Sequence, residues 1–173
     1  MKLDLTPLLG GEVDTIPIDY PLTIEGKIRG VAFPNPVRVL GTITDKAGYI
    51  ALNAALDLSY DTVCDRCLAP IHRDEVLKVA RTVALSGSLE NEDQDDYLIA
   101  QGRMLELDEP FLEEIELNFP TKFLCNEDCR GLCPRCGRDL NKGACACETK
   151  QIDPRMAVFA KLLEKKDHKK DQT

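Results

Sequence analysis

The chain has 173 residues, of which 43% are hydrophobic and 30% charged, and its formal net charge is −8. This composition argues against disorder throughout, and the length allows one domain with a small appendage. The acidic excess argues against a continuous basic surface for nucleic acid, although a local basic patch stays compatible with it. No apolar run reaches the about 18 residues of a membrane span, and the opening residues lack a secretion-signal pattern. We therefore expect a cytoplasmic protein without a membrane partner.

Strand patterns dominate the first two thirds of the chain. Residues 37–44 and 49–60 alternate between apolar and polar side chains, and the loop 45–48 predicts a hairpin between them. Further strands are expected at 23–31, at 77–85, where Arg81 interrupts the apolar face, and at 97–99. Short strands joined by short loops favour an antiparallel sheet.

Two helix starts share one signature, an aspartate followed closely by a proline. Asp108 is the expected N-cap of a helix over 108–118, which Pro120 ends. Asp153 and Pro154 predict a last helix over 153–165, followed by a lysine-rich tail. The predicted fold class is α+β: an antiparallel β-rich domain with a closing helix over residues 1–120, then a segment over 121–173. That segment contains a cysteine-rich zinc knuckle, the terminal helix and the basic tail.

Six of the eight cysteines lie between residues 125 and 147. At their centre is the sequence Cys-Pro-Arg-Cys-Gly, residues 133–137. Its proline fixes φ, and its glycine can take positive φ, so a tight turn can aim both thiolates at one metal ion. Clustered cysteines in a cytosolic protein are more often metal-binding or catalytic than disulfide-bonded, and four thiolates suit Zn²⁺.

We predict one Zn²⁺ per chain, held by the two knuckle cysteines and by a C-x-x-x-C pair spaced like one helical turn. The predicted ligands are Cys125, Cys129, Cys133 and Cys136. The alternative second pair is Cys145 and Cys147.

Cys64 and Cys67 form a separate C-x-x-C pair at the end of the 49–60 strand pattern. Three interpretations stay open: metal binding together with two of the distal cysteines, packed or free thiols that shape a turn, and a redox pair. The surrounding strand patterns are antiparallel, whereas a thioredoxin-like redox motif needs a βαβ context. The redox interpretation therefore ranks last.

The sequence contains no pattern that predicts catalysis. It has neither a G-x-x-x-x-G-K-[ST] phosphate loop nor a G-x-S-x-G elbow, and its only histidines are His72 and His168. An all-cysteine zinc site normally leaves no open coordination position. We expect a protein that is not an enzyme and has no small-molecule substrate.

Four motifs, in this order and spacing, resemble the YceD-like family of large ribosomal RNA subunit accumulation proteins. They are Cys-Asp-Arg-Cys-Leu at 64–68, the 108–118 helix running into Leu-x-Phe-Pro, Cys-x-Gly-Leu-Cys-Pro-x-Cys-Gly-x-x-Leu-Asn at 129–141, and Asp-Pro-Arg at 153–155. The resemblance extends over roughly residues 37–164.

This resemblance implies a ribosome-biogenesis factor that supports the synthesis, processing or stability of large-subunit ribosomal RNA, without an assigned enzyme activity. The implied partner is pre-ribosomal large-subunit RNA or a large-subunit ribosomal protein. A direct RNA contact would use local positive charge, with Arg130, Arg135 and Arg138 favoured over the lysine tail. The alternative is a zinc-ribbon adaptor or redox-sensing protein in another complex.

Overall fold

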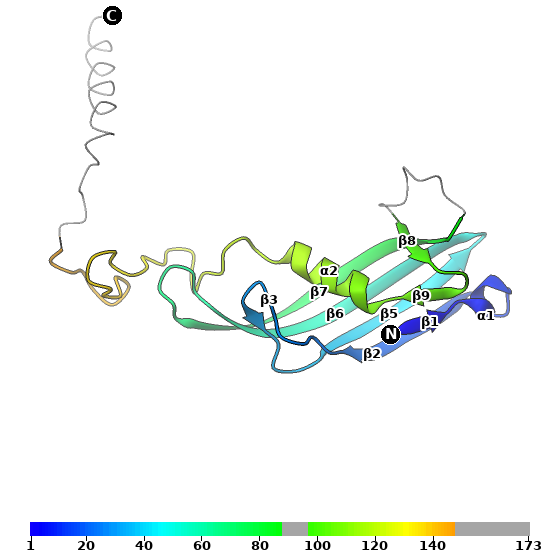
Figure 1. The fold of residues 1–173 in the computed structure, drawn as a ribbon, viewed down its shortest axis with the longest axis horizontal. Coiled ribbons are helices and arrows are strands. Elements are labelled where there is room, and N and C mark those ends of the chain that lie inside the picture. Colours follow the sequence, from blue (N-terminus) through cyan, green and yellow to red (C-terminus); the bar gives the residue numbers. More distant parts are fainter. Residues whose placement is uncertain (88–96, 148–173) are drawn as a thin grey trace, which may run out of the picture. The chain divides into compact units, whose positions relative to one another are not determined.

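The structure, a computed structural model, describes residues 1–87 and 97–147. It divides into two compact units, Met1–Glu127 and Asp128–Thr173. Among the described residues, strands far outnumber helices, in agreement with the β-rich, broadly α+β class expected (Figure 1). The predicted helix 153–165 and the lysine tail lie outside the described residues.

The first unit is built on four long antiparallel strands that lie side by side in the order β2, β5, β6, β7 (Figure 1). Their bounds are Thr15–Leu22, Val37–Lys46, Tyr49–Val63 and Pro70–Leu85. The short strands β3 (Lys27–Ile28) and β4 (Val31–Ala32) pair with each other, and β4 also pairs with β6. Strand β8 (Tyr97–Ala100) is parallel to β7, an exception to the expected antiparallel order. A separate two-stranded sheet contains β1 (Lys2–Asp4) and β9 (Met104–Glu106).

The period-two prediction for the central hairpin is confirmed. Along β6 the even-numbered side chains from Ile50 to Tyr60 are buried, and on β5 Val37, Val39 and Ile43 share the same face. Gly41 also follows this alternation. A Cβ atom at Gly41 would lie 2.4 Å from the Asn53 carbonyl oxygen, so the strands can approach this closely only because the residue is glycine.

Helix α2 (Asp108–Asn118) packs on the buried face of the sheet through Phe111 and Ile115. Its span agrees with the prediction, but the predicted N-cap was wrong. Leu107 is the N-cap, and Asp108 is the first helical residue, where its carboxylate accepts a 2.8 Å hydrogen bond from the Tyr20 hydroxyl. The short helix α1 (Thr6–Leu9) contributes Leu8 to the same core.

The arginine that interrupts the apolar face of β7 has a partner on α2. The Arg81 guanidinium donates to the Glu114 carboxylate at 2.6 Å, and the Glu114 side chain is only 15% exposed. The interruption therefore marks where the helix crosses the strand.

Two strand predictions were wrong between residues 15 and 32. Strand β2 was missed because Pro17 and Pro21 disrupt its pattern, yet it is an edge strand, where a missing N–H donor is tolerated. The single strand expected at 23–31 is instead the short pair β3 and β4. Arg29 and Gly30 reverse the chain between them with φ values of 50° and 84°.

An aromatic cluster holds the chain that follows α2 against the end of the β6–β7 hairpin. The Tyr60 ring centroid lies 5.3 Å from that of Phe119 and 6.1 Å from that of Phe123, and Phe33 packs beside them. Since Tyr60 is fully buried, this cluster is part of the main core. It delivers residues 119–125 to the hairpin tip, where the first cysteine pair lies.

Candidate metal centres

All eight cysteines fall into two groups of four, and within each group the sulfur atoms lie within 4.8 Å of one another. The first cysteine group is Cys64, Cys67, Cys125 and Cys129. The second cysteine group is Cys133, Cys136, Cys145 and Cys147. None of the eight forms a disulfide.

The structure separates the four predicted ligands into the two groups. Cys125 and Cys129 join the hairpin pair, whereas Cys133 and Cys136 join the pair named as the alternative. Residues 125–129 form bends and a turn, not the helical turn that we had assumed. The spacing therefore identified the thiol residues but misassigned their neighbours, since it carries no information about a hairpin tip about 60 residues earlier.

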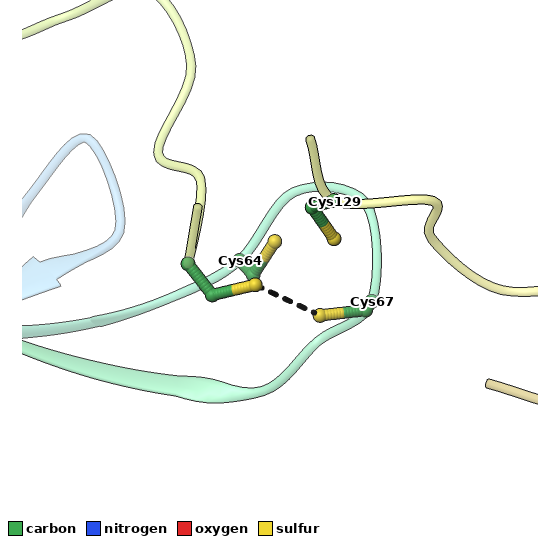
Figure 2. A group of neighbouring side chains, drawn as sticks. Cys64, Cys67 and Cys129 are labelled. Atoms are coloured by element: carbon green, nitrogen blue, oxygen red, sulfur yellow. Dashed lines mark hydrogen bonds between the residues drawn. The ribbon is translucent and has the colours of Figure 1, made fainter. Parts of the chain in front are cut away.

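Figure 2 shows the sulfurs of Cys64, Cys67 and Cys129 pointing toward one another. The Cys67 sulfur also lies 3.6 Å from the Cys125 sulfur. Cys64, Cys67 and Cys129 are buried and Cys125 is exposed, so the group closes on one side and opens to solvent on the other.

The tight turn between Cys64 and Cys67 is closed by two backbone hydrogen bonds. The Cys64 N–H donates to the Ala69 carbonyl at 2.8 Å, and the Leu68 N–H donates to the Cys64 carbonyl at 2.9 Å. Leu68 takes φ of +59° to complete the turn. This geometry brings both thiols to the inner side of the hairpin tip.

The two residues between these cysteines hold the chain that carries Cys125. The Asp65 N–H donates to the Phe123 carbonyl at 2.8 Å, and the Asp65 carboxylate accepts from the Phe123 N–H at 2.7 Å. Arg66 donates to the Glu127 carbonyl at 3.3 Å. The Cys-Asp-Arg-Cys motif thus supplies two thiols and the groups that position a third.

The turn of the second cysteine group repeats this pattern. The Cys133 N–H donates to the Arg138 carbonyl, and the Gly137 N–H donates to the Cys133 carbonyl, both at 2.9 Å. Gly137 takes φ of +71°, as its place in the Cys-Pro-x-Cys-Gly sequence predicted. A bridge between Leu132 and Asp139 continues the turn as a small hairpin.

Asn141 ties the two ends of this segment together. Its side-chain oxygen accepts from the Arg130 N–H at 2.7 Å, and its amide nitrogen lies 3.4 Å from the Cys129 sulfur. Asn141 therefore links the backbone of Arg130 to the sulfur of the preceding residue, Cys129.

The hydrogen bonds in each turn shift the first cysteine of each pair toward the thiolate. Burial opposes ionisation of Cys64, but backbone N–H groups of Cys125, Cys67 and Arg66 bond to its sulfur and lower its pKa to about 6. Without a metal ion, the first thiol of this group is therefore readily ionised near neutral pH.

In the second group, the pKa of one thiol is lowered and that of a neighbouring thiol is raised. Backbone N–H groups of Cys136 and Arg135 lower the pKa of Cys133 to about 6. The hydrogen bond with Cys136, burial and the negative charge of the neighbouring sulfurs raise the pKa of Cys147 to about 12. Four thiols this close resist complete ionisation unless a cation offsets their repulsion.

The residues in both groups fit a tetrahedral metal ion. A zinc–sulfur distance of about 2.3 Å places the four sulfurs about 3.8 Å apart, which agrees with groups that lie within 4.8 Å. Soft thiolate ligands in this number select Zn²⁺ or an iron–sulfur centre over Mg²⁺ or Ca²⁺. Each group can therefore hold one metal ion without a further ligand.

The predicted RNA-contacting arginines surround the second group. Arg130, Arg135 and Arg138 are exposed, and Arg138 also donates to the Ala144 carbonyl at 3.3 Å.

No polar or charged side chain is buried within 1–87 and 97–147. In the same residues, no helix has the length and apolar character needed to cross a membrane.

Together, the sheet and the paired cysteine turns define a β-rich protein with two candidate thiolate metal centres. The family model for the large ribosomal RNA subunit accumulation protein YceD matches residues 52–163. This match covers more than half of the chain and includes every cysteine, and the chain belongs to this family.

The proteins similar to this chain include two uncharacterized bacterial proteins. The uncharacterized protein Rv2926c of Mycobacterium tuberculosis is 29% identical over 102 residues, which make up 58% of this chain and 49% of that protein. The chain thus matches about half the length of this relative. The uncharacterized protein YlbN of Bacillus subtilis is 24% identical over 155 residues, or 89% of this chain and 88% of that protein. No solved structure matches this chain significantly.

Proposed function

We propose that this protein is a non-enzymatic, cytoplasmic ribosome-biogenesis factor that supports the synthesis, processing or stability of large-subunit ribosomal RNA. The family match over residues 52–163 is the observation that carries the proposal. The family description names the RNA whose accumulation is affected, and this chain has the family's motifs at its hairpin tip and its knuckle.

We further propose that the second cysteine group binds Zn²⁺ as a structural ion. The Gly137 turn, the hydrogen bonds to Cys133 and the four clustered sulfurs support this assignment. Four thiolates complete a tetrahedral zinc site, which leaves no position for substrate. Zinc here holds the knuckle in shape and presents its exposed side chains.

The partner we propose is pre-ribosomal RNA, contacted through Arg130, Arg135 and Arg138. Residues 128–147 contain four basic and two acidic side chains, a balance of +2, whereas Zn²⁺ with four thiolates carries −2. The zinc-loaded segment is therefore close to neutral overall. We expect each guanidinium to act by itself, through hydrogen bonds to phosphate or by stacking on unpaired bases.

The functional test is the ratio of large-subunit to small-subunit ribosomal RNA in a deletion strain. The proposal predicts a lower ratio, restored by the full chain, and co-sedimentation of the protein with large-subunit precursors on a sucrose gradient. A normal ratio together with no co-sedimentation would remove the ribosomal function.

The RNA contact has its own test, in which the three arginines are replaced together by glutamine. Loss of three phosphate contacts on single-stranded RNA lowers the salt slope of binding by about 2. The matched control removes the same charge elsewhere: Lys46→Gln, Lys78→Gln and Lys122→Gln. Equal weakening by both triple variants would indicate a non-specific charge effect, and unchanged binding in both would favour a ribosomal protein as the partner.

The second candidate function is a redox-sensing adaptor in another complex. The 3.6 Å separation of the Cys67 and Cys125 sulfurs favours it, because two such thiols can be oxidised to a disulfide by a peroxide. This candidate predicts reversible disulfide formation at micromolar peroxide in the zinc-loaded protein. A structural zinc site predicts thiols that resist such oxidation.

A further inference from the structure

The hairpin tip of the first unit repeats, in its backbone, the turn of the second cysteine group. In both turns the first cysteine N–H donates to the carbonyl five residues later, and the N–H four residues later donates back to that cysteine. The residue at this fourth position has positive φ in both, +59° at Leu68 and +71° at Gly137. Equal geometry from such different sequences indicates an equal task, which is to aim two thiols at one point.

The positive φ of Leu68 is stronger evidence for a constrained turn than a glycine would be. The left-handed conformation is unfavourable for a leucine, and burial cannot compensate because its side chain is 63% exposed. Strain of this kind persists where the surroundings over-determine the backbone. A metal ion that grips both Cys64 and Cys67 supplies such a constraint.

The third thiol of the group is brought to this turn by contacts that do not involve sulfur. The paired hydrogen bonds between Asp65 and Phe123, and the packing of Phe123 against Tyr60, place Cys125 beside Cys67. Cys129 completes the group of four sulfurs within 4.8 Å.

We propose that the first cysteine group binds a second Zn²⁺, so that each chain carries two zinc ions in two independent four-cysteine sites. This ion fastens the tip of the β6–β7 hairpin to the segment that follows α2. Four thiolates satisfy zinc without a further ligand, so this site too is structural. The proposal rests on the geometry of the cysteines and does not depend on the ribosomal function.

The test is the zinc content of the full chain, purified under reducing, chelator-free conditions and measured by elemental analysis and native mass spectrometry. We expect two zinc ions in the unaltered chain. The double variant Cys64→Ser, Cys67→Ser should retain one, and so should the matched control Cys133→Ser, Cys136→Ser. A single zinc in the unaltered chain that survives in the Cys64/Cys67 variant would overturn the proposal, as would a first group that holds iron.

Alkylation of the unaltered chain gives the same answer if the variants fail to fold. With two zinc ions bound, all eight cysteines should react slowly with an alkylating reagent, and chelation should speed all eight. Rapid alkylation of the first group beside a protected second group would contradict the proposal. Peptide mapping measures the extent of alkylation at each residue of the first group: Cys64, Cys67, Cys125 and Cys129.

Discussion

Between Leu5 and Phe123 the buried side chains other than Cys64 and Cys67 are aliphatic or aromatic, and nearly all of them form one continuous core. In residues 128–147, by contrast, only Cys129 and Cys133 have buried side chains. A segment of this size without an apolar core cannot offset its conformational entropy by hydrophobic burial. Two regions of one chain are therefore stabilised in different ways. The sheet depends on packing, and the cysteine segment depends on its thiols and the ion that they bind.

The largest effect that we expect comes from removing the knuckle thiols. The double variant Cys133→Ser, Cys136→Ser should unfold residues 130–147, which follow the last ligand of the first cysteine group. Structural zinc contributes about 10–16 kcal/mol of apparent binding free energy in small zinc domains. The sheet should keep its fold. Limited proteolysis checks both statements, with cleavage expected within 130–147 and not within β5 or β6. A segment that stays resistant to protease in this variant would show that it does not need the ion.

The converse variant breaks the core and leaves the thiols intact. Leu56 is fully buried at the centre of β6. Leu56→Ala should lower the free energy of unfolding by about 2–5 kcal/mol, the range for a truncated core leucine. Denaturant unfolding measures this loss. Zinc bound by the second cysteine group should be unchanged, and a parallel loss of that zinc would mean that the two regions are not separately stabilised.

The sheet itself could be predicted from the sequence because its signal is local. The alternation along β5 and β6 lies within each strand, and burial follows this pattern directly. Strand β2 was not predicted because its two prolines interrupt the alternation. An edge strand tolerates proline, but the sequence of one segment does not show that the strand lies at an edge.

The grouping of the cysteines could not be read in the same way. The residue types and the Gly137 turn were predictable, but the first group depends on long-range contacts, above all Asp65 with Phe123. The sequence did contain one signal, because the C-x-x-C motif occurs twice. In the structure, the residue that follows each copy has positive φ. Leu68 obscured this signal because leucine rarely takes that conformation.

A smaller effect should follow from filling the space between β5 and β6. At Gly41 a methyl group would lie 2.8 Å from the Ala54 Cβ atom and 2.4 Å from the Asn53 carbonyl oxygen. Gly41→Ala should therefore destabilise the sheet by about 1–3 kcal/mol, the usual cost of overpacking. The neighbouring Thr42→Ala is the control and should change stability by less than about 0.5 kcal/mol. Equal unfolding midpoints for the two variants would contradict the close approach.

Exchanging the residues with positive φ tests whether the two turns are equivalent. Gly137→Leu should destabilise the second turn by about 1–2 kcal/mol, because a leucine is forced into the left-handed region. Leu68→Gly removes that strain from the first turn and should leave its zinc at least as firmly bound. Competition with a chelator ranks the variants, and faster zinc loss from Leu68→Gly would show that the leucine side chain itself supports the site.

The smallest effect concerns an exposed ion pair on the β6–β7 hairpin. A 2.7 Å hydrogen bond to Asp61 raises the pKa of His72 above its ordinary value. The stabilisation is therefore present below the ordinary histidine pKa and is lost as pH rises through the raised pKa. Asp61→Asn should return the His72 pKa toward its ordinary value in an NMR titration, with little change in overall stability. An unchanged titration would exclude Asp61 as the cause.

Hydrogen exchange of the full chain, with and without a zinc chelator, tests most directly whether the two regions are stabilised differently. Our account predicts that chelation removes amide protection throughout 128–147 and at the turn containing Leu68, while the central amides of β5 and β6 stay protected. Undiminished protection of 128–147 after complete zinc removal would contradict it. Simultaneous loss of protection in both regions would also contradict it, since the sheet would then depend on the metal as well.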